Sequence, residues 1–130
     1  PANPLTPRVA INHVWLRHFG APLGATVFEF GANGQPPTHP ALLDWLAREL
    51  VATDWSLKAL HRQLVTSETY RLSSAPRTGA APQRERDPEN RLYWRMNARR
   101  MEAEVVRDST LAVAGHLQRQ FSGPDLDPNL

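Results

Sequence analysis

Two runs of apolar residues at helical spacing, joined by a three-residue link, constrain the fold of this chain more than any other feature. The first run consists of Leu42, Leu43, Leu46, Ala47 and Leu50, and the second of Leu57, Leu60, His61, Leu64 and Val65. Each run places its apolar side chains on one helix face. The link Thr53-Asp54-Trp55 is typical of a helical hairpin, so we expect helices over about residues 40–52 and from Ser56 onward. We expect Trp55 to fill the corner and Ser56 to cap the second helix.

A further helix is predicted before this hairpin. Thr6-Pro7 is a typical helix opening, because the hydroxyl can cap free N–H groups and proline at the first position loses nothing. Gly20 supplies a left-handed stop, so the helix covers about residues 7–19. Its inward face is formed by Ile11, Val14, Trp15 and His18.

The segment from residue 20 to residue 37 is rich in Gly and Pro, which excludes a long regular element. Residues 26–30 alternate like a strand, but no second strand-like run exists to pair with them. We therefore expect an extended segment that carries Phe28 and Phe30 into a helical core. The predicted fold is all-α, an irregular bundle of five or six helices with a long Gly/Pro-rich loop after the first helix.

The C-terminal part is predicted to hold a loop and two more helices. Residues 73–87 are typical of a mobile surface loop. Asp87-Pro88 then opens a short helix that carries Leu92, Tyr93 and Met96 inward, and a longer helix runs from about residue 97 to residue 120. We expect residues 1–130 to form a single helical domain.

Composition and charge exclude several classes of protein. The chain has no Cys, which excludes disulfides, zinc ribbons and covalent haem attachment within it. No apolar run approaches the roughly 18 residues of a membrane span. Residues 71–100 are rich in Arg, but no base-reading motif accompanies them, so nucleic-acid binding is not favoured. We interpret this stretch as a solvated surface paired with the acids Glu85, Asp87 and Glu89.

Three residues are candidates for catalysis. His39 stands at a helix start beside Thr38, Asp44 follows one turn later, and His61 lies within the second apolar run. For His39 we prefer helix capping, and for His61 a hydrogen-bonded, semi-buried side chain. No hydrolase or nucleotide-binding motif accompanies them.

No metal or cofactor site is expected within this chain. His13 and His18 lie about 140° apart around one helix, so they cannot both bind one metal ion. Glu104 and Asp108 share a helix face like paired catalytic carboxylates, but flanking arginines favour a surface ion-pair ladder. The aromatic residues Trp15, Trp45, Trp55 and Trp94 are expected to pack in the core.

Four segments together carry a resemblance to a known family. They are NPLTPRVAINHVWLRHFG, FGANGQPPTHPALLDWLA, DWSLKALHRQLVTSETYRLSS and DPENRLYWRMNARRMEAEVVRDSTLAVAG. In this order they resemble a planctomycete-specific domain of unknown function, found C-terminal in large exported proteins that often carry a cytochrome c-like domain. The resemblance covers about residues 3–123 and implies that the chain is the N-terminal part of a longer family domain.

The resemblance implies export to the periplasm or cell surface, with any haem on a neighbouring domain. Our first hypothesis is an accessory or interaction module that packs against neighbouring domains of the same polypeptide or against a protein partner. The alternative is a fragment of an exported enzyme, acting on polysaccharide, whose site uses His39, Asp44 and His61 and is completed by residues beyond this chain.

Overall fold

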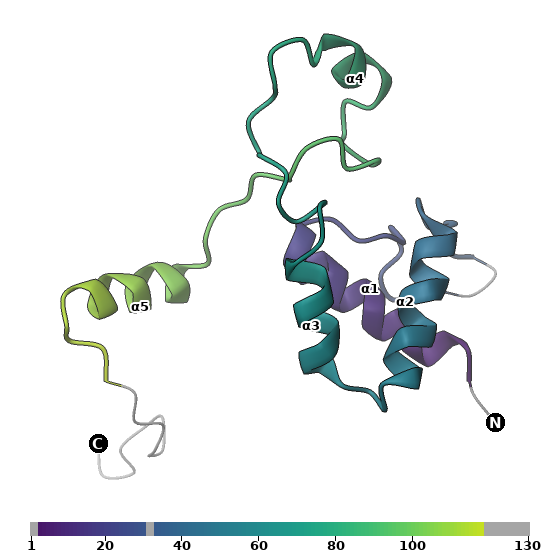
Figure 1. Ribbon diagram of the computed structural model, residues 1–130, viewed down its shortest axis with the longest axis horizontal. Coiled ribbons are helices and arrows are strands. Elements are labelled where there is room, and N and C mark those ends of the chain that lie inside the picture. The colour runs from purple at the N-terminus through teal and green to yellow at the C-terminus, as the bar shows by residue number, and fades with distance from the viewer. Residues whose placement is uncertain (1–2, 31–32, 119–130) are drawn as a thin grey trace. The chain divides into compact units, whose positions relative to one another are not determined.

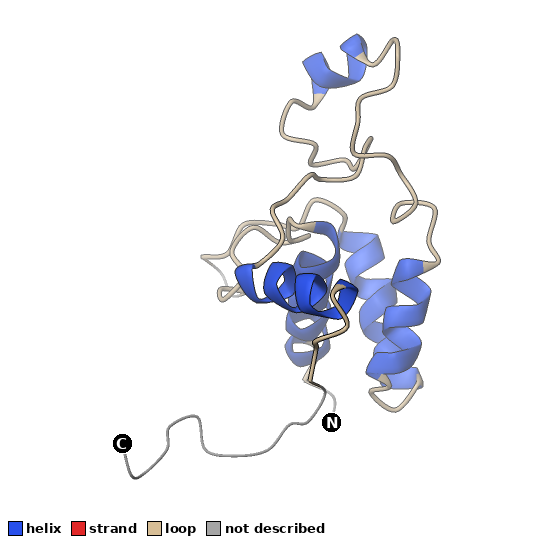
Figure 2. Ribbon diagram, turned by 90° about the vertical axis from the view of Figure 1, so that its left-hand side faces the viewer, coloured by secondary structure: helices blue, strands red, loops and turns tan. Residues whose placement is uncertain are grey.

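The computed structural model describes residues 3–30 and 33–118, and within these ranges the regular structure is entirely helical. The helices are α1 (Leu5–Phe19), α2 (Pro40–Ala52), α3 (Leu57–Val65), α4 (Ala81–Arg86) and α5 (Ala103–Val113). Figures 1 and 2 show these helices, and no strand occurs in the described ranges. The predicted all-α fold is therefore confirmed.

The internal contacts of the chain divide it into two compact units. The first unit comprises residues 1–98 and contains α1 to α4, and the second comprises residues 99–130 and contains α5. Within the described part of the chain, no helix is long and apolar enough to cross a membrane.

The core of the first unit lies among α1, α2 and α3, where α1 packs against α2 and α2 packs against α3. It consists of Ile11, Trp15, Phe19, Leu23, Leu43, Leu46, Ala47, Leu50, Leu60, Leu64 and Tyr93. The helical stripes therefore predict most of the core correctly. Val14, also expected there, is only partly buried and packs against its edge.

The corner between α2 and α3 is a tight turn with an unusual backbone. Asp54 and Trp55 both have positive φ angles, of 50° and 60°, and the Trp55 N–H donates a hydrogen bond to the carbonyl of Leu50. Ser56 caps α3 as predicted, because its hydroxyl accepts a hydrogen bond from the N–H of Ala59. The prediction that Trp55 fills the corner is wrong, since its side chain is 44% exposed. The turn is closed by its left-handed backbone and by this backbone hydrogen bond, and burial of the indole is not required.

The start of α1 differs from the prediction. The helix begins at Leu5, and the side chain of Asn3 accepts a hydrogen bond from the Leu5 N–H, so Thr6 lies inside the helix and is not its cap. The predicted end is correct. Gly20 has a φ of 78°, a left-handed conformation that glycine adopts without strain, and its N–H bonds to the Leu16 carbonyl.

The segment after α1 forms a turn where the sequence predicts an extended strand-like run. The Glu29 N–H donates to the Thr26 carbonyl, and the Thr26 hydroxyl donates to the Glu29 carbonyl. This turn breaks the alternation of side chains. Phe30 packs against the core, but Phe28 is 89% exposed, so its predicted burial is wrong.

Residues 87–97 form a series of turns, so the short helix predicted there is wrong. Asn90 and Tyr93 have φ angles of 57° and 55°, which a right-handed helix cannot contain. The Asp87 carboxylate accepts hydrogen bonds from the N–H groups of Arg91 and Leu92, as a helix cap would, but it closes a loop. Tyr93 is nevertheless buried, as predicted.

The remaining two helices also differ from their predicted bounds. Helix α4 lies inside the predicted loop of residues 73–87 and buries no residue. Helix α5 is shorter than the predicted helix over residues 97–120, and the last two of those residues lie outside the described ranges.

Candidate functional site

An ion pair joins α1 to α2 and separates two hollows on the first unit. The Arg8 Nε atom donates to Asp44 Oδ1 at 2.6 Å, and Arg8 Nη1 donates to the Pro4 carbonyl at 2.8 Å. The hydrogen bond from Arg8 lowers the pKa of Asp44 below its usual value, and the same bond raises the pKa of the guanidinium. The Asp44 carboxylate is therefore ionised at neutral pH and already accepts a hydrogen bond from Arg8. Both properties make it a poor general base.

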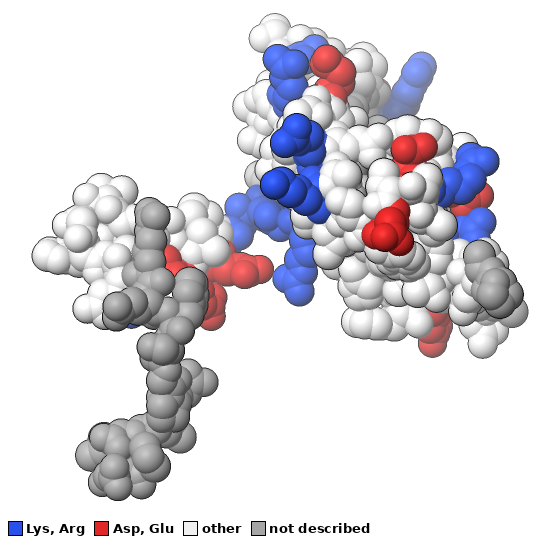
Figure 3. All heavy atoms as spheres, turned by 60° about the horizontal axis from the view of Figure 1, so that its bottom comes forward, with Lys and Arg blue, Asp and Glu red and all other residues white. Residues whose placement is uncertain are grey.

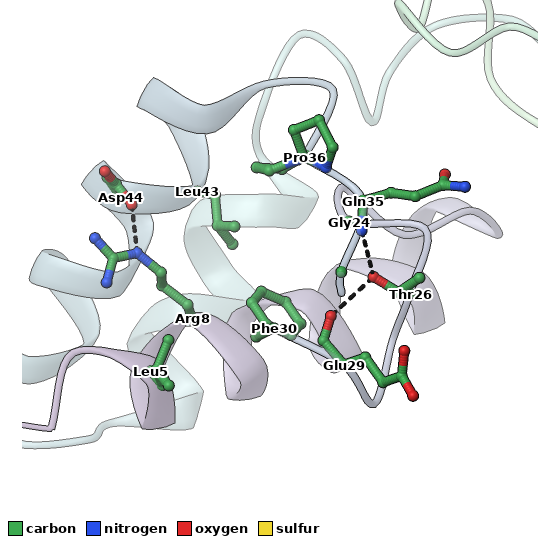
Figure 4. Close-up of a pocket in the computed structure, with 12 residues that line it drawn as sticks. Leu5, Arg8, Gly24, Thr26, Glu29, Phe30, Gln35, Pro36, Leu43 and Asp44 are labelled. Atoms are coloured by element: carbon green, nitrogen blue, oxygen red, sulfur yellow. Dashed lines mark hydrogen bonds and ion pairs between the residues drawn. The ribbon is translucent and has the colours of Figure 1, made fainter. Parts of the chain in front are cut away.

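The first hollow, which we call the loop pocket, lies between this ion pair and the loop after α1 (Figure 4). It has a volume of about 320 Å³. Its lining residues are Leu5, Arg8, Gly24, Thr26, Glu29, Phe30, Gly34, Gln35, Pro36, Pro37, Leu43 and Asp44. The Thr26 hydroxyl accepts a hydrogen bond from the Gln35 N–H at 3.0 Å and donates to the Glu29 carbonyl at 2.8 Å, which holds the loop in place. Figure 4 shows the Phe30 ring between Arg8 and this turn.

The second hollow, which we call the Trp55 groove, is larger and mainly apolar. It has a volume of about 730 Å³ and lies between the start of α1 and the outer side of α2. Its lining residues are Asn3, Pro4, Thr6, Pro7, Arg8, Asp44, Ala47, Arg48, Val51, Ala52 and Trp55. Neither hollow is lined by a histidine. Carboxylates line both hollows, Glu29 and Asp44 in the first and Asp44 in the second.

The structure does not bring the three predicted catalytic residues together. His39 Nδ1 is hydrogen-bonded to the Thr38 hydroxyl at 2.9 Å, and its ring lies 5.9 Å from that of Tyr93. Asp44 is paired with Arg8, and His61 with His18. No hydrogen bond or ion pair joins any two of the three within the described contacts. The predicted capping role of His39 is also wrong, because its side chain makes no hydrogen bond to the start of α2.

His61 forms a contact that the sequence analysis did not anticipate. Its Nδ1 atom lies 2.7 Å from Nε2 of His18, which comes from the last turn of α1. The residue is hydrogen-bonded as predicted, but it is exposed on the surface of α3 and not semi-buried. The partners are 43 residues apart, so no local spacing could indicate their meeting.

Tyr93 is the centre of a buried network that the sequence analysis also missed. Its hydroxyl accepts a hydrogen bond from Trp15 Nε1 at 2.8 Å and donates to the Ala21 carbonyl at 2.9 Å. Its ring contacts those of Trp15 and Phe19 edge-on. Burial raises the pKa of its phenol, and the hydrogen bond from Trp15 opposes this shift. The hydroxyl is protonated, and it both accepts and donates a hydrogen bond within the protein. Tyr93 is therefore a structural residue of the core.

The other charged and aromatic candidates are surface features. Asp108 pairs with its neighbour Arg107 at 3.1 Å, and both side chains are largely exposed, so this pair contributes little to stability. Trp15 is buried, but Trp45 and Trp55 are 42% and 44% exposed, which contradicts their predicted core packing.

The Arg-rich stretch shows none of the predicted pairing with Glu85, Asp87 and Glu89. No described ion pair involves these acids, and Asp87 is used instead by backbone N–H groups. Figure 3 shows Lys and Arg side chains gathered along one edge of the displayed face of the first unit, with Asp and Glu side chains mostly apart from them.

Comparison with known families places this geometry in context. Residues 1–130 match the family PSD1, described as a protein of unknown function (DUF1553). The chain belongs to this family. The match spans both compact units of the PSD1 chain, including the ion pair, both hollows and the histidine pair. No curated protein and no solved structure matches the chain. Membership of PSD1 therefore assigns no activity to the chain.

Proposed function

We propose that this PSD1 domain is a helical interaction module that packs against a neighbouring domain of the same polypeptide or a protein partner. The observation that carries the proposal is the Trp55 groove, which has apolar walls and is built on two packed helices. Concave, mainly apolar hollows of this size with a few polar groups at their edge are the usual form of a binding site. A preformed groove also lowers the entropic cost of binding.

The wall of the groove is held in place by the hairpin corner. Trp55 is fixed in its left-handed conformation by the hydrogen bond from its N–H to Leu50, so its indole is held by a defined backbone. Val51, one turn before it, is 45% exposed. Aromatic side chains held in this way are frequent anchors of protein interfaces.

The rim of the groove indicates the chemistry of the partner. Arg48 lines the groove and is exposed, whereas Asp44 already receives a hydrogen bond from Arg8. An apolar segment with an acidic side chain at its edge would fit both the walls and this rim.

A second apolar surface supports the same class of function. Helix α5 buries none of its residues, although it carries Val105, Val106 and Val113, which are 46%, 49% and 92% exposed. An amphipathic helix of 11 residues gains little stability unless its apolar face is covered. Together with Phe28, these valines are further candidates for contact with a partner.

The family resemblance supports a proposal for the location of the protein and for its partner. Domains of this type resemble modules of exported proteins with a cytochrome c-like domain, so a periplasmic or cell-surface location with haem on the neighbouring domain is part of what we propose. The partner to test first is therefore the cytochrome c-like domain.

The experiment compares two valines in similar positions. Val51→Glu places a charge in the groove, whereas Val65→Glu places the same charge outside it, and both residues lie near the end of a helix and are about equally exposed. Binding of the separately expressed neighbouring domains, and of an apolar fluorescent dye, should be weakened by Val51→Glu only. Equal binding by the two variants would remove the groove from the proposal.

A further inference from the structure

The contact between His18 and His61 carries an inference that is independent of the proposed function. The two imidazoles come from α1 and α3, and Nε2 of His18 lies 2.7 Å from Nδ1 of His61. The ring centroids are 5.0 Å apart with the planes tilted by 55°. Two neutral imidazoles can share only one proton in such a contact, so one nitrogen donates and the other accepts.

We propose that these two side chains form a binding site for a divalent transition-metal ion, with Cu²⁺ bound most tightly. Imidazole nitrogen is a preferred ligand of Cu²⁺, Ni²⁺ and Zn²⁺, and the affinity of such sites is generally highest for Cu²⁺. Each histidine offers the metal one nitrogen, and these nitrogens already lie next to each other.

The separation of the two nitrogens suits the geometry of Cu²⁺ closely. With metal–nitrogen bonds of about 2.0 Å, adjacent corners of a square plane lie roughly 2.8 Å apart, whereas tetrahedral Zn²⁺ requires roughly 3.3 Å. The observed separation is 2.7 Å. The rings therefore have to turn their lone pairs toward a common point, with almost no change in the distance between them.

Solvent on the side of His61 and aromatic rings on the side of His18 form the surroundings of the site. His61 is exposed, and on the side of His18 the rings of Tyr70 and Phe19 form an aromatic wall at 5.9 and 6.5 Å. No group of three or more His, Cys, Asp or Glu side chains is placed to hold a metal ion within the described part of the chain. Among the described residues the chain thus supplies two ligands, and water supplies the others.

Metal binding changes the hydrogen bonding without releasing a proton from a neutral pair. The ring that donates through its bridging nitrogen moves that proton to its other nitrogen, and both bridging nitrogens then bind the metal. The ion thereby ties the last turn of α1 to α3, two helices that are far apart in the sequence. Binding should therefore raise the thermal midpoint of unfolding.

The test is calorimetric titration of the whole chain with Cu²⁺ and Zn²⁺. We expect one Cu²⁺ per chain, weaker binding of Zn²⁺, and a paramagnetic resonance spectrum with two nitrogen ligands. His18→Gln and His61→Gln should each weaken Cu²⁺ binding at least about tenfold, because loss of even an outer-shell partner costs that much. Each should also abolish the metal-dependent rise in thermal midpoint.

Matched controls separate this site from other histidines. His13→Gln changes a histidine on the same helix as His18, in contact with Phe28, and should leave Cu²⁺ binding unchanged. Because His61 is exposed, His61→Gln should fold normally and can still form a hydrogen bond. Cu²⁺ binding that survives both His18→Gln and His61→Gln, or the absence of binding at micromolar metal, would overturn the proposal.

Discussion

The indole nitrogen of Trp15 donates a hydrogen bond to the hydroxyl of Tyr93, 78 residues further along the chain. The Tyr93 hydroxyl in turn donates a hydrogen bond to the Ala21 carbonyl. The side-chain amide of Asn97 donates to the Phe19 carbonyl, which gives the same segment a second attachment to the end of α1. Residues 87–97 are therefore attached to the three-helix core by buried and partly buried polar contacts, although they form no regular structure.

Tyr93→Phe is expected to destabilise the first unit by about 1–3 kcal/mol. The change leaves the buried Trp15 Nε1 donor without its partner, and an unsatisfied buried donor costs about that much. Urea unfolding should show a lower midpoint with an unchanged slope. Tyr70→Phe is the control, because Tyr70 is 37% exposed and its loss of a hydroxyl should have little effect. Equal midpoints for the two variants would contradict the role of Tyr93.

Stability should decline at alkaline pH through the same residue. Burial raises the pKa of Tyr93 above its ordinary value of 10.0, so the folded state retains a proton that the unfolded state releases. This contribution is complete below about pH 10 and is lost as the pH rises through the folded pKa. Urea midpoints measured between about pH 8 and pH 11 should fall less steeply for Tyr93→Phe than for the unchanged chain.

Asn12→Ala is expected to loosen the loop after α1. Asn12 is fully buried, and its side chain bonds to both the N–H and the carbonyl of Gly24, at 2.9 and 3.0 Å. Removal of the amide leaves both backbone groups unsatisfied, at a cost of about 1–3 kcal/mol for each. Faster amide exchange at Gly24 would accompany the lower unfolding midpoint. Normal exchange protection there would show that water replaces the side chain.

Leu46→Ala should be much more costly than the same change at Leu57. Leu46 is 2% exposed within the core, so its truncation should cost about 2–5 kcal/mol, whereas Leu57 is 51% exposed. Surface truncations usually change stability by only about 0.5 kcal/mol. Thermal unfolding followed by circular dichroism compares the two directly. A similar loss in both variants would place Leu46 outside the core.

Helical periodicity predicts the elements that bury a stripe of aliphatic residues. The stripes of α2 and α3 contain Leu43, Leu46, Leu60 and Leu64, and all four are buried. The cap at Ser56 follows from a residue type with a strong local preference for that position. These features depend on neighbours in sequence, which is why the sequence alone suffices for them.

The failures occur where a local pattern competes with other interactions. Asp87 and Pro88 resemble a helix start, but the side chain of Asn90 bonds to the Arg95 backbone and to Asn97, which stabilises turns in place of a helix. In the same way, the turn begun by Thr26 overrides the alternating pattern that predicts burial of Phe28.

The candidate sites depend on distant pairs, so the sequence could not predict them. Arg8 and Asp44 are 36 residues apart, and His18 and His61 are 43 residues apart. Asp44 and His61 are residue types that often act in catalysis, but their partners Arg8 and His18 become evident only in the fold, where α1 packs against the hairpin. The spacing of His13 and His18 within one helix shows that they cannot bind the same metal ion. It gives no information on contacts between side chains of different helices.

The long separation between Trp15 and Tyr93 also orders the folding of the first unit. The hairpin of α2 and α3 closes through neighbours in sequence, whereas Tyr93 must close a far larger loop, which costs more chain entropy. We therefore expect the three helices to assemble first, with the Trp15 indole lacking its hydroxyl partner until Tyr93 arrives. The fluorescence of that indole should therefore report on the last folding step, in which the segment that carries Tyr93 docks onto three helices that have already assembled.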